Sequence, residues 1–286
     1  MKMNIVPAAN GKKWMTQGFA LFRQHAKSIF LATFLYVLII ISFFVVSRFL
    51  LWVVGVPIII ALGVLGPALM ASMVSIFRVL DRGQPVSLDV FLQPFKTRFA
   101  PLCAFGALYM LAVASVYAMG AGIFVLLVGD DSRQVLRVLV AMMNNAVTGA
   151  DSEYLLRILP SLMVAYTVSE LVVLLSMFPL LMAYYFAPLL IGWDKVPVGK
   201  AIVFSFVACL KNWRPFLLFS LFWMVATGML VTVVVVFVMV FMLALPPTLG
   251  LLLAAPLYLV MGGLIIALTF AFYYMSYKDI FTPDEA

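Results

Sequence analysis

Charged residues are scarce in this chain of 286 residues: only 10% are Asp, Glu, Lys or Arg, whereas 66% are hydrophobic. A soluble domain is about one quarter charged and about half apolar. The apolar runs leave no polar segment longer than about thirty residues, so the sequence excludes a separate catalytic domain outside the membrane. We therefore expect a polytopic membrane protein.

Cysteine and histidine are almost absent. Cys103 and Cys209 lie far apart in the sequence, and His25 is the single histidine. This composition excludes a disulfide framework and a metal site built from Cys or His, and it favours an exposed interfacial position for His25. We expect no cofactor.

Catalytic motifs are also missing. The sequence contains no phosphate-binding Gly-Lys loop, no nucleophile elbow and no His-Glu-x-x-His metal motif. The net charge of +7 comes from Lys and Arg beside apolar runs, and not from a basic stripe on a soluble face. We therefore expect neither an enzyme nor a nucleic-acid-binding protein.

Six apolar runs are each long enough to cross the hydrocarbon layer, which takes about 20 helical residues. They predict an all-α membrane bundle with spans at 28–47, 50–77, 101–128, 171–191, 216–245 and 251–276. The start of the fourth span is ambiguous, because 158–169 either continues the helix outward or dips into the membrane separately. Between the third and fourth spans, residues 133–144 predict an amphipathic helix on the outer surface.

The distribution of positive charge predicts the orientation. If the N-terminus is inside, fourteen of the eighteen Lys and Arg residues lie on the inner side, and the outer side holds Arg48, Arg133, Arg137 and Arg157. Cytoplasmic segments carry an excess of Lys and Arg in membrane proteins. We therefore expect both termini in the cytoplasm.

Two cytoplasmic elbows organise the chain. The first begins at Asp81-Arg82, and the second begins at Asp194-Lys195. In each, an acid–base pair and a Pro-Val follow one span, and a short amphipathic piece with a basic cluster precedes the next span. The N-terminal residues 12–27 have the same character and predict a basic helix in the headgroup layer.

The N-terminal helix carries an apolar stripe at Met15, Phe19, Phe22 and Ala26, and we expect Trp14 to anchor it at the interface. The tyrosine pairs Tyr184-Tyr185 and Tyr273-Tyr274 lie near inner ends of spans. An aromatic belt explains them better than a ligand cage.

The recurrence of these features predicts three tandem helical hairpins within one integral membrane domain covering residues 1–286, with repeats at about 12–80, 81–192 and 194–278. Every repeat enters the membrane from the same side. The repeats are therefore parallel, unlike the inverted repeats of many secondary transporters. This lowers the expectation of an alternating-access carrier without excluding one.

The N-terminal pairs Gly18-Phe19 and Leu21-Phe22, the Asp-Lys-x-Pro-Val elbow at 194–198, and the stretch from Phe204 to Pro215 resemble a family of uncharacterised six-span inner-membrane proteins of proteobacteria. The chain is also similar in plan to the membrane domains found alone or fused to glycerophosphodiester phosphodiesterases. It has no attached phosphodiesterase domain. The resemblance implies a bacterial inner-membrane location and carries no active site.

Glu170 is the one acid inside an apolar run, and acids within membranes are functional candidates. Its position at the outer boundary of the fourth span favours an interfacial or structural role. An ion pair with Arg48 and a role in transport stay open as alternatives.

The predicted interaction surfaces are cationic elbows and stripes of small residues. We expect the elbows to contact anionic headgroups through Arg78, Arg82, Lys96, Arg98, Lys195, Lys200, Lys211 and Arg214. We expect close helix packing at Ala114, Ala118, Gly122, Gly263, Ala267 and Ala271. The favoured function is a non-enzymatic protein that organises lipids or partner membrane proteins, a second copy included; the alternative is a transporter or channel for a small solute or ion that uses Glu170.

The predicted topology has a direct test. A reporter that works only in the cytoplasm, fused after Ala286, should be active because the count of cations places that end inside. A periplasmic reporter at the same position serves as the control and should be inactive. The reverse pattern would contradict the six-span topology.

Overall fold

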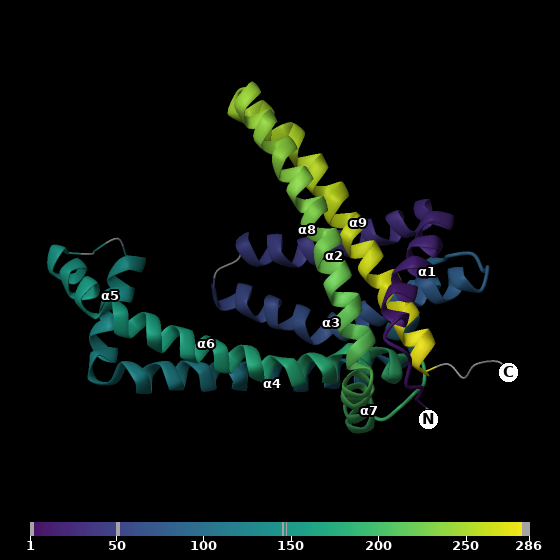
Figure 1. The fold of residues 1–286 in the computed structure, drawn as a ribbon, viewed down its shortest axis with the longest axis horizontal. Coiled ribbons are helices and arrows are strands. Elements are labelled where there is room, and N and C mark those ends of the chain that lie inside the picture. The colour runs from purple at the N-terminus through teal and green to yellow at the C-terminus, as the bar shows by residue number, and fades with distance from the viewer. Residues whose placement is uncertain (1–2, 50–51, 145, 147, 282–286) are drawn as a thin grey trace. The chain divides into compact units, whose positions relative to one another are not determined.

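The computed structural model describes residues 3–49, 52–144, 146 and 148–281, and within them the chain is helical without strands. The elements are α1 (Asn10–Gln24), α2 (Ala26–Phe49), α3 (Trp52–Asp81), α4 (Leu88–Val128), the 3-10 turn η1 (Gly129–Asp131), α5 (Ser132–Met143), α6 (Gly149–Gly192), α7 (Val198–Lys211), α8 (Trp213–Ala244) and α9 (Pro247–Phe281). Figure 1 shows these helices in chain order by colour.

Six of these helices are long and apolar enough to cross a membrane in the described part of the chain: α2, α3, α4, α6, α8 and α9. The prediction of an all-α polytopic bundle with six spans is therefore confirmed. The ambiguous segment 158–169 continues the fourth span, since α6 is one helix of 44 residues. At about 1.5 Å per residue, α6 is roughly twice as long as the hydrocarbon layer is thick.

The chain divides into two compact units, and the second predicted hairpin contributes to both. Unit 1 comprises Met1–Ala107 and Met182–Ala286, and unit 2 comprises Leu108–Leu181. Each unit is described separately below. The three-hairpin repeat itself stays a prediction.

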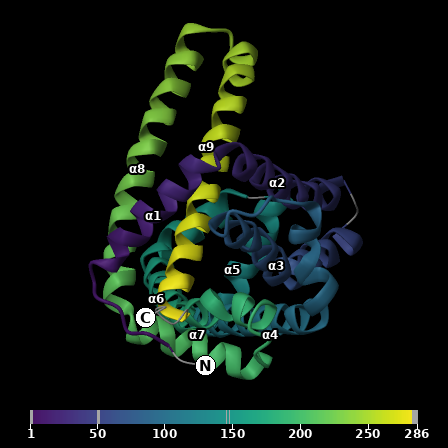
Figure 2. The ribbon, with the colours of Figure 1, turned by 90° about the vertical axis from the view of Figure 1, so that its right-hand side faces the viewer.

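The core of unit 1 is built around the last turns of α9. Helix α1 packs against both α8 and α9, as Figure 2 shows where α1 crosses α9. Gly18 allows this approach, because a Cβ atom there would lie 3.1 Å from the backbone carbon of Ala271. Trp14 is only 1% exposed, and its ring lies 5.1 Å from that of Phe216. The predicted role of Trp14 as an interfacial anchor is therefore wrong.

The buried face of α1 also differs from the predicted stripe. Leu21 and Phe22 are buried, but Phe19 is 51% exposed. The hydrophobic pattern favoured Phe19 because such a pattern counts only apolar side chains. It does not show that neighbouring helices approach closely at Gly11 and Gly18. The face containing those glycines is the one that packs against α8 and α9.

The N-terminal segment before α1 is held by the end of the chain. The backbone N–H of Asn4 donates to the carbonyl of Ile280 at 2.8 Å. The N–H of Val6 donates to Oδ1 of Asn212 at 2.9 Å, and Nδ2 of Asn212 donates to the carbonyl of Asn4 at 3.2 Å. Asn212 is fully buried, so its amide is satisfied entirely within the protein.

Three similar backbone breaks connect an amphipathic helix to a span. They lie at His25 (φ −123°, ψ 28°), at Arg98 (φ −139°, ψ 22°) and at Asn212 (φ −104°, ψ 27°). All three residues have a small positive ψ, close to that of the sparsely populated bridge region and outside the helical range. The chain therefore changes direction at one residue, without a loop between the two helices. Their recurrence at equivalent places favours the predicted threefold repeat.

Unit 2 consists of the C-terminal part of α4, η1, α5 and the first part of α6. Gly120 marks the close contact between α4 and α6, since a Cβ atom there would lie 2.4 Å from Cγ2 of Val173. The hydroxyl of Tyr154 donates to Oδ1 of Asp131 at 2.8 Å and ties α6 to η1. The amphipathic helix predicted at 133–144 is present as α5, with Val135 and Val138 buried.

Gly106 provides a test of helix packing. A Cβ atom at this position would lie 2.2 Å from the carbonyl oxygen of Val64, so Gly106→Ala should force α3 and α4 apart and cost about 1–3 kcal/mol. Gly122→Ala on the same helix is the control, because among the described residues no atom beyond its chain neighbours and its own helix backbone lies within 4 Å of its Cβ position. Thermal unfolding in detergent should show a lower midpoint only for Gly106→Ala; equal midpoints would contradict the packing.

Candidate functional site

The elbow end of unit 1, where the loops 82–87 and 193–197 leave the spans, contains three carboxylates bound to aromatic donors. The first is Asp279 on α9. Its Oδ2 accepts a hydrogen bond from Nε1 of Trp14 at 2.7 Å and another from Nδ2 of Asn10 at 2.8 Å. Nζ of Lys13 lies 4.0 Å from Oδ1. Asp279 therefore fixes α1 on the end of α9.

The second carboxylate, Asp81, closes α3. Its Oδ2 accepts a hydrogen bond from the hydroxyl of Tyr274 at 2.8 Å and one from Nζ of Lys278 at 2.7 Å. Tyr274 and Lys278 are four residues apart on α9, so they lie on the same face of that helix. Asp81 thus joins the end of α3 to the last turns of α9.

The third carboxylate, Asp194, follows α6. Its Oδ2 accepts a hydrogen bond from the hydroxyl of Tyr277. Although the residue is exposed as a whole, partial burial of its carboxyl raises the pKa of Asp194, while the hydroxyl of Tyr277 and the charge of Arg78 oppose this rise. Asp194 therefore ties the second elbow to α9.

The neighbouring Trp193 strengthens this connection. Its Nε1 donates to the hydroxyl of Ser75 on α3 at 2.9 Å. The guanidinium carbon of Arg78 lies 4.6 Å from the centre of the indole ring, within the range of a cation–π interaction. Trp193 therefore holds the second elbow on α3 as well as on α9.

The three acids form one structural system centred on α9. Tyr274, Tyr277 and Asp279 come from two successive turns of this helix. Sequence analysis identified Asp81 and Asp194 as markers of the elbows but missed the partners of all three acids. Tyr273 and Tyr274 are only 3% and 5% exposed, so their assignment to an aromatic belt is wrong. The recurrence of Asp after the ends of spans was the sequence signal that indicated this site.

The cations predicted to contact headgroups differ in exposure. Arg78 and Arg98 are half-buried, and the remaining six are exposed: Arg82, Lys96, Lys195, Lys200, Lys211 and Arg214. Lys96 forms an ion pair with Asp89 at 2.6 Å within α4. Arg214 lies over the ring of Trp213, with its guanidinium carbon 5.5 Å from the centre.

Glu170 and Arg48 belong to different units. Glu170 is half-buried on α6 in unit 2, next to the buried Ser169. Arg48 is exposed near the end of α2 in unit 1, where it lines an apolar groove of about 700 Å³ together with Phe44 and Val56. Their ion pair and the transport role of Glu170 stay predictions.

The two small-residue stripes differ in exposure. Ala267 and Ala271 on α9 are fully buried inside unit 1, whereas Gly263 on the same stripe is half-buried. On α4, the three residues of the other stripe are all exposed: Ala114, Ala118 and Gly122. The α9 stripe is thus covered largely by the chain itself, and the α4 stripe is open.

The bond between Trp14 and Asp279 can be tested by removing the indole donor. Trp14→Phe should destabilise the protein by about 1.5 kcal/mol or more, because a buried hydrogen bond to a carboxylate is lost. Trp213→Phe is the matched control, since Trp213 is 51% exposed. Thermal unfolding in detergent measures both. Similar small shifts in the two variants would show that the bond to Asp279 does not stabilise unit 1.

Comparison with known proteins agrees with this architecture. The chain is 24% identical over 230 residues to a protein of Burkholderia thailandensis named as a probable inner membrane protein, and the match covers 78% of this chain and 75% of that protein. No protein-family model and no solved structure matches the chain. The similarity to glycerophosphodiester phosphodiesterase membrane domains is not shown. The distant relative and the six apolar helices together identify a multi-pass protein of the inner membrane.

Proposed function

We propose that this protein is a non-enzymatic organiser of anionic phospholipids, which it gathers at the cytoplasmic leaflet through its elbows. In this proposal both termini and both elbows face the cytoplasm, as the distribution of Lys and Arg predicts. Anionic lipids are concentrated in that leaflet, and each nearby Lys or Arg contributes about 1 kcal/mol of attraction.

The observation that carries the proposal is that the acids of the elbow end have partners inside unit 1, whereas lysines of the second elbow stay exposed. Asp81, Asp194 and Asp279 are each bound to an aromatic donor inside unit 1. One carboxylate oxygen of each acid is therefore held by a contact within the protein. Around them, Lys195, Lys200 and Lys211 remain exposed on the second elbow. This arrangement leaves a positive surface for external anions.

Rigidity of the elbow end also supports the proposal. Phe186, Ile191 and Ile280 are buried there at 1% exposure or less, and Ala201 and Ala208 bury one face of α7. A cation on such a fixed element contacts a headgroup at a defined place, because its backbone does not have to be ordered on binding. The basic elbows thus present a preformed surface.

A second candidate function is association with another membrane helix. The α4 stripe of Ala114, Ala118 and Gly122 is exposed, and in the described part of the chain no other segment comes within 4 Å of the Cβ position of Gly122. Small residues at this spacing allow two helix backbones to approach closely in a membrane. The stripe therefore suits a second copy of this chain or a partner membrane protein.

The lipid proposal is tested with two variants, one that lacks positive charges of the second elbow and one that lacks positive charges on the predicted outer side. A triple variant with Lys195→Gln, Lys200→Gln and Lys211→Gln should co-purify with less phosphatidylglycerol relative to phosphatidylethanolamine, because three cations of the elbow surface are lost. Lipid mass spectrometry after gentle solubilisation measures the ratio.

The matched control removes three exposed arginines from the opposite side, with Arg133→Gln, Arg137→Gln and Arg157→Gln. It should leave the lipid ratio unchanged. A C-terminal reporter checks that neither variant inverts the topology. An equal ratio in the two triple variants would contradict the proposal.

A further inference from the structure

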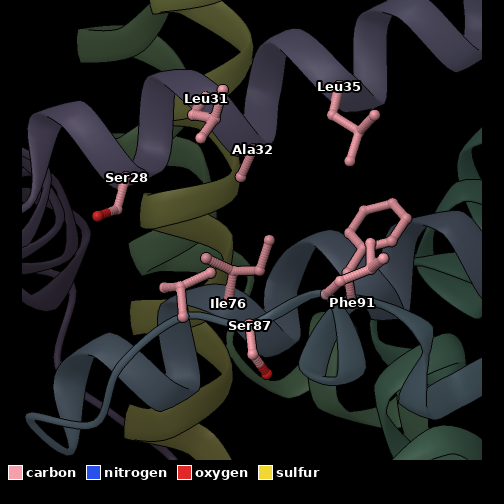
Figure 3. A pocket seen from close by; sticks show the side chains of 9 residues that line it. Ser28, Leu31, Ala32, Leu35, Ile76, Ser87 and Phe91 are labelled. Atoms are coloured by element: carbon pink, nitrogen blue, oxygen red, sulfur yellow. The ribbon is translucent and has the colours of Figure 1, made fainter.

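An open apolar groove lies between α2, α3 and the first elbow (Figure 3). Leu31, Ala32 and Leu35 from α2 face Ile76 of α3 and Phe91 of α4 across it. The groove measures about 300 Å³, at the lower end of the range of about 300–1,000 Å³ for ligand pockets. It suits a slender apolar ligand.

The groove lies near the ends of two spans, and we infer that it is at the boundary of the hydrocarbon layer. Ser28 lies in the first turn of α2, and Ile76 lies near the end of α3. Val86 and Ser87 of the first elbow close the same groove. Where spans enter and leave the membrane, the molecules surrounding a protein are phospholipids, whose chains begin at this depth.

Exposed cations that are close in sequence to the lining residues favour an anionic headgroup. Lys27 precedes Ser28 and is exposed, and Arg82 begins the elbow loop and is exposed. The two nearby acids are bound to other cations: Asp81 to Lys278 at 2.7 Å, and Asp89 to Lys96 at 2.6 Å. Lys27 and Arg82, which flank the lining segments in sequence, therefore provide charge complementary to a phosphate.

We propose that this groove is a binding site for one anionic phospholipid of the cytoplasmic leaflet. One acyl chain lies between Leu35 and Phe91, and the phosphate lies at the end of the groove near Ser28, Lys27 and Arg82. The assignment of the leaflet rests on the proposed function. The groove adds a discrete site to the diffuse electrostatic attraction of the elbows.

The test is photo-crosslinking of the full-length protein in nanodiscs of phosphatidylethanolamine containing phosphatidylglycerol with a diazirine in one acyl chain. Mass spectrometry should find the label on residues 28–35 and 86–91. Leu35→Trp fills the groove and should abolish that labelling. Leu38→Trp is the control, because Leu38 is on the same helix, is 51% exposed and does not line the groove.

A second variant leaves the groove intact and removes its charge. Lys27→Gln combined with Arg82→Gln should reduce labelling by the phosphatidylglycerol probe to the level given by a phosphatidylethanolamine probe. Size-exclusion chromatography verifies that each variant is folded.

The inference is overturned if Leu35→Trp is labelled like the unmodified protein, or if both probes label the groove equally from the start. It is also overturned if Leu31→Cys forms a disulfide with a second copy, since the groove would then be a protein interface. The total content of phosphatidylglycerol in the same samples reports separately on the elbow surface. Enrichment of this lipid without groove labelling would reject the groove and leave the proposed function standing.

Discussion

Unit 1 depends on hydrogen bonds between carboxylates at the ends of its spans and aromatic donors inside it. A carboxylate near hydrocarbon is costly unless its charge is satisfied by hydrogen bonds or a counter-ion. Here Asp81 has both a hydroxyl and an ammonium partner, and Asp279 has an indole and an amide. These bonds cross from α3 and α1 to α9. One helix therefore sets the position of the others at this end.

The six spans and the elbows could be predicted because the signals behind them are local. Length and hydropathy define a span, and an amphipathic piece with a basic cluster defines an elbow. The partners of the acids could not be predicted in the same way. Tyr274 lies 193 positions from Asp81 along the chain, and a tyrosine near a span end is equally typical of an interfacial belt.

The glycine that makes a close helix contact could not be predicted from sequence spacing either. The regular spacing of Ala114, Ala118 and Gly122 drew attention to a stripe that is exposed in unit 2. The close contact between α4 and α6 in unit 2 is made at Gly120, which lies two positions from Gly122 and is not part of the stripe. A spacing rule identifies a surface on which helices can approach, but only the positions of neighbouring side chains decide which glycine is used. The roles of Glu170 and Arg48 are undecided for the same reason, because they depend on distant neighbours.

The attachment of the N-terminal segment to Ile280, Asn212 and the end of α9 has a consequence for biosynthesis. Helix α1 leaves the ribosome first, but its docking surface on α8 and α9 is completed last. At about 5–20 residues per second, this interval is on the order of tens of seconds. During that time Trp14 lacks its native ring partners Phe216 and Phe219, so this part of the nascent helix has to be sheltered by the bilayer surface or an insertase. Final closure of the molecule is thus a late, post-insertional event.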